Sequence, residues 1–211
     1  MEHVDEIISI LKKHYITDFF AEQHDRDPFK VLISCLISLR TKDEVTYPAA
    51  QRLFELAHTP KKMMSLSEKQ IAEAIYPAGF YNTKAKRIKS IAKTLYENHN
   101  SQVPDTIDEL VKLKGVGRKT ANIVMVFGFN KPAVPVDTHV HKIANRLGWL
   151  STACPDQTEQ ELRKKLPKKY WLEINELFVR HGQNVCLSVS PWCSTCQIKQ
   201  YCKRVGVSTS R

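Results

Sequence analysis

The chain lacks any apolar run long enough to span a bilayer, and its 211 residues include only seven glycines. No segment has the pattern of a strand, an internal repeat or a low-complexity tract, so the sequence predicts a helical globular fold. Residues 1–6 are acidic and lack the basic-then-apolar order of a signal peptide. We therefore expect a soluble intracellular protein, long enough for one large domain or two small ones.

Acidic residues are also few relative to basic ones. Twenty-two Asp and Glu stand against thirty-two Lys and Arg, which gives a formal net charge of +10. This excess does not specify a fold, but it favours a polyanionic partner, and nucleic acid is the first candidate. A basic surface that serves only solubility is the alternative.

Four of the six cysteines gather near the C-terminus with the spacing C-x6-C-x2-C-x5-C, at Cys186, Cys193, Cys196 and Cys202. An intracellular setting favours metal-bound or free thiols over disulfides. A zinc ribbon needs two C-x-x-C hooks, whereas only Cys193 and Cys196 form one here. One hook with outlying cysteines suits a [4Fe–4S] cluster, while an all-thiolate zinc site and disulfides remain as alternatives.

Helix signals begin near the N-terminus. Apolar residues at helical spacing from Val4 to Tyr15 mark one face of a first helix. Asp27 is a cap that precedes Pro28 at the first helical position. The run 29–39 is apolar on all sides, so this second helix should be central and buried, with Cys35 as a core thiol.

Capping-box spacing predicts two further helix starts, at Thr41 with Glu44 and at Ser67 with Gln70. Pro48 requires the first of these helices to begin so close to it that the missing N–H falls in or near the first turn. We expect six helices between about 27 and 128. The later ones begin at 82–83, 106 and 118, and others follow at 137–138, 157–166 and 169–181.

A glycine hairpin lies between two of the predicted helices. Gly115 and Gly117 flank one apolar residue, and a helix starts directly after them. Glycines allow a positive-φ turn and a close approach of a ligand, and the N–H groups of the following helix favour an anion. Because Lys114 and Arg118 are adjacent, we interpret the segment as a helix–hairpin–helix that grips a DNA phosphate. An ordinary glycine turn between packed helices is the alternative.

Lys119 follows the hairpin and opposes the macrodipole of its own helix. That field, together with the neighbouring cations, should favour the neutral amine, which is a nucleophile able to form a Schiff base. A second phosphate-binding lysine is the alternative. Asp137 follows an apolar segment and precedes a helix, so it is either an N-cap or a partly desolvated carboxylate that stabilises a cation or takes a proton.

These features together resemble the endonuclease III family of base-excision DNA glycosylases, in the helix–hairpin–helix superfamily with a cluster loop. The resemblance covers nearly the whole chain. Its motifs are Leu113-Lys-Gly-Val-Gly-Arg-Lys-Thr-Ala-Asn122, Val136-Asp-Thr-His139, Gly79-Phe-Tyr-Asn-Thr-Lys84 and the cysteine array. The resemblance implies an all-α fold of two helical domains with a DNA-binding cleft between them. The six-helix domain would span 23–130, and residues 1–22 and 131–211 would form a discontinuous [4Fe–4S] cluster domain.

The resemblance also implies the chemistry. Lys119 would attack C1′ of a damaged nucleotide, displace an oxidised pyrimidine and form a Schiff base that permits β-elimination, while Asp137 assists. Lysine at this position indicates a bifunctional glycosylase and AP lyase. A monofunctional mismatch glycosylase and a non-catalytic, zinc-stapled DNA-binding protein are the alternatives.

The implied partner is damaged double-stranded DNA, bound by a monomer that is DNA-associated inside the cell, in the cytoplasm or nucleoid if prokaryotic. No membrane is expected. The residues implied in DNA contact are Arg40, Phe80, Asn82, Lys84, Gly115, Gly117, Arg118, Thr138 and His139.

Three positions depart from the family pattern. Arg40 stands where the best-known member has a glutamine that fills the gap left by the flipped nucleotide, so the opposite-base preference should differ. Phe80 replaces an aliphatic wedge, and core packing is the alternative for its ring. The loop 187–192 lacks the basic residues that the family often carries there.

Overall fold

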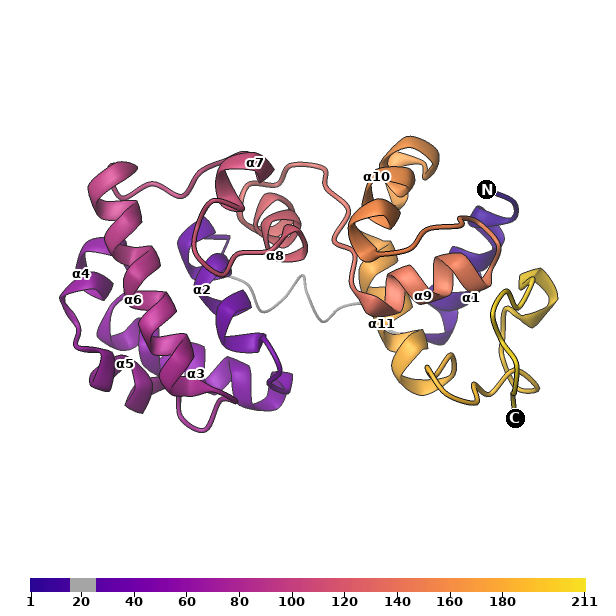
Figure 1. Cartoon of the computed structure of the whole chain (residues 1–211), viewed down its shortest axis with the longest axis horizontal. Helices are drawn as coiled ribbons and strands as arrows, with labels where there is room; N and C mark the ends of the chain where they lie inside the picture. Colours follow the sequence, from indigo (N-terminus) through magenta and orange to yellow (C-terminus); the bar gives the residue numbers. More distant parts are fainter. Residues whose placement is uncertain (16–25) are drawn as a thin grey trace. The chain divides into compact units, whose positions relative to one another are not determined.

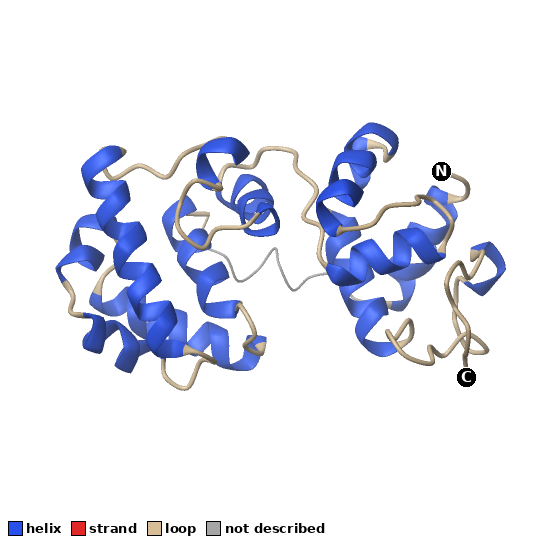
Figure 2. Ribbon diagram, in the orientation of Figure 1, coloured by secondary structure: helices blue, strands red, loops and turns tan. Residues whose placement is uncertain are grey.

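The computed structural model describes residues 1–15 and 26–211, and within these ranges every regular element is a helix (Figures 1 and 2). The predicted all-α class is confirmed. The chain divides into two compact units. Residues 24–131 form what we call the continuous unit, and residues 1–23 with 132–211 form the terminal unit. None of the described helices is long and apolar enough to cross a bilayer.

The continuous unit is built around α2 (Pro28–Ser38), as its apolar sequence predicts. Asp27 caps α2 by accepting hydrogen bonds from the N–H groups of Phe29 and Lys30, and Pro28 occupies the first helical position. The helices that complete the unit are α3 (Asp43–Leu56), α4 (Pro60–Ser65), α5 (Glu68–Ile75), α6 (Tyr81–Asn98), α7 (Ile107–Leu110) and α8 (Arg118–Ile123). Helix α2 packs against α3, α6 and α8, so each buried Leu or Ile on it contributes roughly 1.5–3 kcal/mol to stability.

Several helix starts differ from the sequence predictions. The capping box at Ser67 is confirmed, but α3 begins after Lys42, which makes no side-chain cap. The Thr41 hydroxyl is used elsewhere, because it accepts hydrogen bonds from Gly79 N and Lys84 Nζ. Pro48 is the sixth residue of α3, in the second turn and thus near the first as expected, and its missing N–H leaves one carbonyl without its helical partner.

Two other differences concern local helix geometry. The sequence analysis missed α4, a short helix with Thr59 as its cap and Pro60 at its first position. The helix expected over 118–127 starts at Arg118 as predicted, but its second half, Val124–Gly128, is a π-helix. Glycine at 128 permits close packing there, since a Cβ would lie 2.9 Å from the Pro28 Cα.

The terminal unit contains α1 (Val4–His14), α9 (Thr138–Arg146), α10 (Pro155–Lys165) and α11 (Glu173–Asn184). One 3-10 turn, Lys168–Tyr170, lies between α10 and α11, and a second, Lys199–Tyr201, follows α11. Figure 1 shows α1, from the start of the chain, beside helices from its last third, and α1 packs against α11. Their apolar faces share one core with Trp149, whose indole N–H donates to the Glu2 carbonyl.

Candidate functional site

The glycine hairpin joins α7 to α8 in the continuous unit. Leu113 and Val116 are buried, and the Val116 N–H donates to the Leu113 carbonyl, which closes the turn. Gly115 has a φ of +88°, a conformation that favours glycine. Gly117 precedes α8, and no atom lies within 4 Å of the position that a Cβ would take there. Packing therefore does not require glycine at 117, whereas close approach of an external group would.

Lys119 is half-buried in the first turn of α8, and Arg118 beside it is also half-buried. The lysine faces the central helix of the unit, because its charge acts on the Cys35 thiol of α2. Burial raises the pKa of Cys35 to about 12, and the nearby ammonium opposes that rise. By its solvent exposure Cys35 is only half-buried, so it is not the fully buried core thiol that was expected, but its raised pKa still keeps the thiol unreactive.

Arg40 and Phe80 occupy the tips of two neighbouring loops in the same unit. Both have left-handed backbone conformations, with φ values of 54° and 58°. The Arg40 Cζ lies 5.6 Å from the centroid of the Phe80 ring, within the range of a cation–π contact. The Phe80 side chain is 63% exposed, so it is not a core residue.

The first turn of α6 contains two further residues from the expected DNA-contact set. Asn82 is exposed and accessible to a ligand. Lys84 is 4% exposed, and its Nζ donates to the Ile37 carbonyl at 2.5 Å and to the Thr41 hydroxyl at 2.7 Å. The structure therefore gives Lys84 a different role from the one expected, because its ammonium is used inside the protein.

In the terminal unit, Asp137 is the N-cap of α9. Its Oδ1 accepts hydrogen bonds from the N–H groups of His139 and Val140 at 2.9 and 3.0 Å. The structural alternative for Asp137, an N-cap, is thus observed. Thr138 is exposed at the first helical position, whereas the His139 ring packs against α11 at Gly182.

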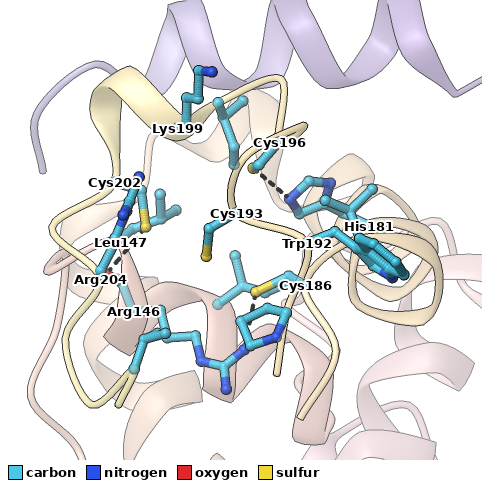
Figure 3. Close-up of a pocket in the computed structure, with 15 residues that line it drawn as sticks. Arg146, Leu147, His181, Cys186, Trp192, Cys193, Cys196, Lys199, Cys202 and Arg204 are labelled. Atoms are coloured by element: carbon cyan, nitrogen blue, oxygen red, sulfur yellow. Dashed lines mark hydrogen bonds between the residues drawn. The ribbon is translucent and has the colours of Figure 1, made fainter. Parts of the chain in front are cut away.

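The four clustered cysteines line one pocket in the terminal unit. In Figure 3 the sulfurs of Cys186, Cys193 and Cys202 face a common space, and Cys196 lies at its edge next to His181. All six cysteines of the chain lie within the described ranges, and all six are free thiols. Within those ranges, no three His, Cys, Asp or Glu side chains converge closely enough to hold a single metal ion.

The pocket supplies hydrogen-bond donors to its sulfurs. Arg146 donates from its guanidinium to Cys186 Sγ at 3.3 Å, and the backbone N–H groups of Ile198 and Arg204 act on Cys196 and Cys202. Such donors stabilise thiolates, which are the form that binds metals. Burial works in the opposite direction and raises the pKa of Cys196 to about 11, so a metal would displace protons when it binds.

A buried chain of polar groups connects α1 to the same pocket. Burial lowers the pKa of His181 to about 4, so this imidazole is neutral at physiological pH. Its Nδ1 lies 3.1 Å from the Tyr15 hydroxyl, and its Nε2 lies 3.5 Å from Cys196 Sγ. In one tautomer, a neutral His181 can therefore accept a hydrogen bond from the Tyr15 hydroxyl at Nδ1 while it donates one from Nε2 to the sulfur.

Sequence reasoning missed Arg146 and Thr41. Arg146 ends α9, forty residues before Cys186, and it also donates to the carbonyls of Leu187 and Ser188. No spacing along the chain indicates such a contact. Thr41 was identified only as a helix cap, because the loop that contains Gly79 is distant in sequence.

Comparisons with known proteins agree with these features. Residues 33–168 match the family described as HhH-GPD superfamily base excision DNA repair protein. Endonuclease III of Thermotoga maritima is 43% identical over 197 residues, which cover 93% of this chain and 92% of that protein.

Two solved structures are similar in fold. A trapped endonuclease III–DNA covalent intermediate matches with a TM-score of 0.81 and 30% identity, over 96% of this chain and 95% of the other. A thermostable thymine-DNA glycosylase matches with a TM-score of 0.79 over 95% of each chain, but at 22% identity this likeness concerns the fold alone.

The sequence match and the fold match extend over both units, and the hairpin with Lys119 lies inside the segment that the family description covers. The relative from Thermotoga is similar across nearly its whole length, so the likeness is not limited to one motif. The chain belongs to the endonuclease III family, within the HhH-GPD superfamily of base excision DNA repair proteins.

Proposed function

We propose that this protein removes oxidised pyrimidines from duplex DNA and then cleaves the strand through a Schiff base on Lys119. Its enzyme class follows from its family: it is a base-excision repair DNA glycosylase and AP lyase. The observation that carries the proposal is the position of Lys119 in the first turn of α8, two residues after Gly117, whose Cβ position is open to an approaching DNA backbone. A related endonuclease III forms a covalent intermediate with DNA.

The reaction begins when the Lys119 amine attacks C1′ of the damaged nucleotide. The new N–C1′ bond replaces the glycosidic bond, whose electron pair leaves with the base, and the base takes up a proton. Loss of a proton from nitrogen and opening of the sugar ring give the Schiff base. Removal of a C2′ proton then expels the 3′ phosphate by β-elimination.

Asp137 assists this chemistry through its carboxylate. One oxygen is held by the first turn of α9, so the group is fixed in orientation before DNA binds. Its negative charge stabilises the positive sugar in the transition state or takes a proton from the attacking amine.

The DNA contacts fall into two groups. Gly115, Gly117 and Arg118 hold a phosphate at the hairpin, and Thr138 adds a contact at the start of α9. Arg40 and Phe80 enter the duplex at the flipped nucleotide, with Asn82 beside them. We assign Lys84 and the His139 ring to packing, because both are turned into the protein. The protein acts on damaged duplex DNA as a monomer.

Cys186, Cys193, Cys196 and Cys202 hold a [4Fe–4S] cluster. The support is their shared pocket, the donors at Arg146, Ile198 and Arg204, and the family to which the chain belongs. A bound cluster would supply a rigid cross-link between the end of α11, which Cys186 follows, and the C-terminal tail, and it takes no part in the steps above.

Borohydride trapping tests the proposal directly. We expect a covalent adduct between the wild-type protein and duplex DNA that contains thymine glycol or an abasic site, and no adduct with Lys119→Gln. Lys114→Gln is the matched control, since it removes a neighbouring hairpin cation but should keep the adduct at saturating DNA. Base release without any adduct would indicate a monofunctional glycosylase, and binding without base release would indicate a non-catalytic protein.

A panel of duplexes with single lesions opposite each of the four bases tests substrate choice. We expect oxidised pyrimidines to be released faster than normal pyrimidines, because damaged bases stack poorly and cost less to flip. Equal rates for damaged and undamaged duplexes would contradict the proposed substrate class.

A further inference from the structure

The backbone is strained at Arg40 and at Phe80, and contacts with neighbouring groups must hold it in this conformation. A left-handed conformation is uncommon outside glycine, and for a residue with a bulky ring such as Phe80 it is an outlier. Such conformations persist only where neighbouring groups over-determine them. Both residues lie at loop tips, so the supporting contacts must come from the bases of the two loops.

The two loops touch through their backbones at Gly79. A Cβ at this position would lie 2.7 Å from the Arg40 carbonyl oxygen, so only glycine permits the contact. The Gly79 N–H donates to the Thr41 hydroxyl at 3.1 Å, which adds a hydrogen bond between the loops. Thr41 follows Arg40, and Gly79 precedes Phe80, so the contact is one residue away from each tip.

Lys84 stabilises this contact between the two loops, which we call the junction. Its ammonium donates to the Thr41 hydroxyl at 2.7 Å and to the Ile37 carbonyl at 2.5 Å. Ile37 is in the last turn of α2, where carbonyls lack helical partners and a cation is favourable. One side chain thus joins the end of α2, the loop 39–42 and the first turn of α6.

Thr41 uses its full hydrogen-bonding capacity at the junction. Its hydroxyl accepts from Lys84 Nζ and from the Gly79 N–H, and it donates to the Leu39 carbonyl at 3.4 Å. Among the residues that the structure describes, no carboxylate pairs with this lysine, and burial lowers its pKa to about 8. The desolvation of this ammonium costs free energy, and such a cost is typical of sites where a fixed geometry serves a function.

We infer that Lys84 and Thr41 are positioning residues that hold the tips at Arg40 and Phe80 at the spacing needed to enter the duplex. This inference rests on the proposed function, in which these two tips replace the flipped nucleotide. Lys84 and Thr41 themselves do not touch DNA. Their loss should slow base flipping and leave the Lys119 amine reactive.

Single-turnover kinetics on two substrates test the inference. Lys84→Met and Thr41→Val remove the donors and the hydroxyl while they keep the side-chain shapes. We expect each variant to release base from a lesion-containing duplex roughly ten- to a hundredfold more slowly, since small misplacements have effects of this order. Borohydride trapping on a single-stranded abasic oligonucleotide should stay within about twofold of wild type, because no base must be flipped.

Lys89→Met is the matched control. Lys89 belongs to the same helix and also donates to a carbonyl at a helix end, that of Leu66 at 2.7 Å, but it is outside the junction. We expect this variant to resemble wild type on both substrates. Equal losses on the duplex and the single strand in Lys84→Met would mean a general structural role and would overturn the inference, as would an unchanged duplex rate. If Lys84→Met fails to fold, Thr41→Val decides by the same criteria.

A double-mutant cycle separates action through Phe80 from other effects. If Lys84 acts by holding Phe80, Lys84→Met should cause little further loss of duplex rate in a Phe80→Ala background. Additive losses would contradict the inference. A wild-type protein that forms no adduct even with the single-stranded substrate would instead refute the Lys119 chemistry, so the two failures are distinguishable.

Discussion

The imidazole of His139 lies so close to Gly182 that a Cβ on the glycine would come within 2.3 Å of Nδ1. This contact joins the first turn of α9 to α11. His139 also donates its backbone N–H to Asp137, so the packing of its ring fixes the turn that orients the proposed catalytic carboxylate. Packing thereby accounts for His139, the last residue of the Val-Asp-Thr-His motif.

Gly182→Ala should destabilise the protein by about 1–3 kcal/mol, because the added methyl must displace the His139 ring from a packed interface. The free energy of unfolding in urea measures this loss. Gly117→Ala is the control, since the structure leaves open space at that Cβ, and the loss of a glycine N-cap should cost no more than about 1 kcal/mol. Equal stabilities for Gly182→Ala and wild type would contradict the contact.

Asp137→Asn should separate capping from catalysis. Asn caps helices about as well as Asp, so we expect stability to change by less than about 1 kcal/mol while base excision falls at least a hundredfold. Asp27 provides the matched control, because it caps α2 through the same two kinds of N–H contact. Asp27→Asn should lose neither stability nor excision, and an active Asp137→Asn protein would rule out a catalytic charge.

Gly117→Ala should also weaken DNA binding. A methyl at this open position would obstruct a phosphate that approaches the hairpin, so we expect affinity for undamaged duplex to fall roughly tenfold. Fluorescence anisotropy over a range of salt concentrations measures this. Because a lost phosphate contact reduces the salt dependence, the slope for the variant should be shallower than for wild type. Unchanged affinity would argue that phosphate is bound elsewhere.

Lys84 should make stability depend on pH in a defined window. Its folded pKa is lowered to about 8 from 10.5, so between these values the unfolded chain holds a proton that the folded protein has released. Stability attributable to this lysine therefore rises with pH across the window, and below about pH 8 the full cost of the buried charge is present. The free energy of unfolding of wild type minus that of Lys84→Met, followed from neutral pH to about 10.5, should increase. A flat or falling difference would contradict the lowered pKa.

The cysteine pocket predicts which thiols matter for metal content. Cys193→Ser should lose bound iron and the broad visible absorption of a cluster, and its terminal unit should unfold at lower denaturant concentration. Cys154 caps α10 outside the pocket, so Cys154→Ser should keep iron and be at least as stable, because serine is the better cap. A colourless wild-type protein with bound zinc would refute the cluster.

Local patterns predicted the helices well where one short-range interaction determines the outcome. The caps at Asp27 and Ser67 formed as predicted, and so did the buried face that begins at Val4. The prediction at Thr41 was wrong, because its hydroxyl is held by Gly79 and Lys84, which are about forty residues away in sequence. Pro48 lies near the first turn of α3 as predicted, and packing of α3 against α2 and α5 offsets the one lost hydrogen bond.

The sequence by itself determined the helical class, the hairpin, the candidate nucleophile Lys119 and the four cysteines. These features depend on residue type and on spacings of a few residues, and neither depends on how the helices pack. Only the tertiary structure decided that Lys84 points inward, that Arg146 reaches Cys186, and that His139 packs on Gly182. Each of these contacts joins residues that are far apart along the chain, and their distances depend on how whole helices pack.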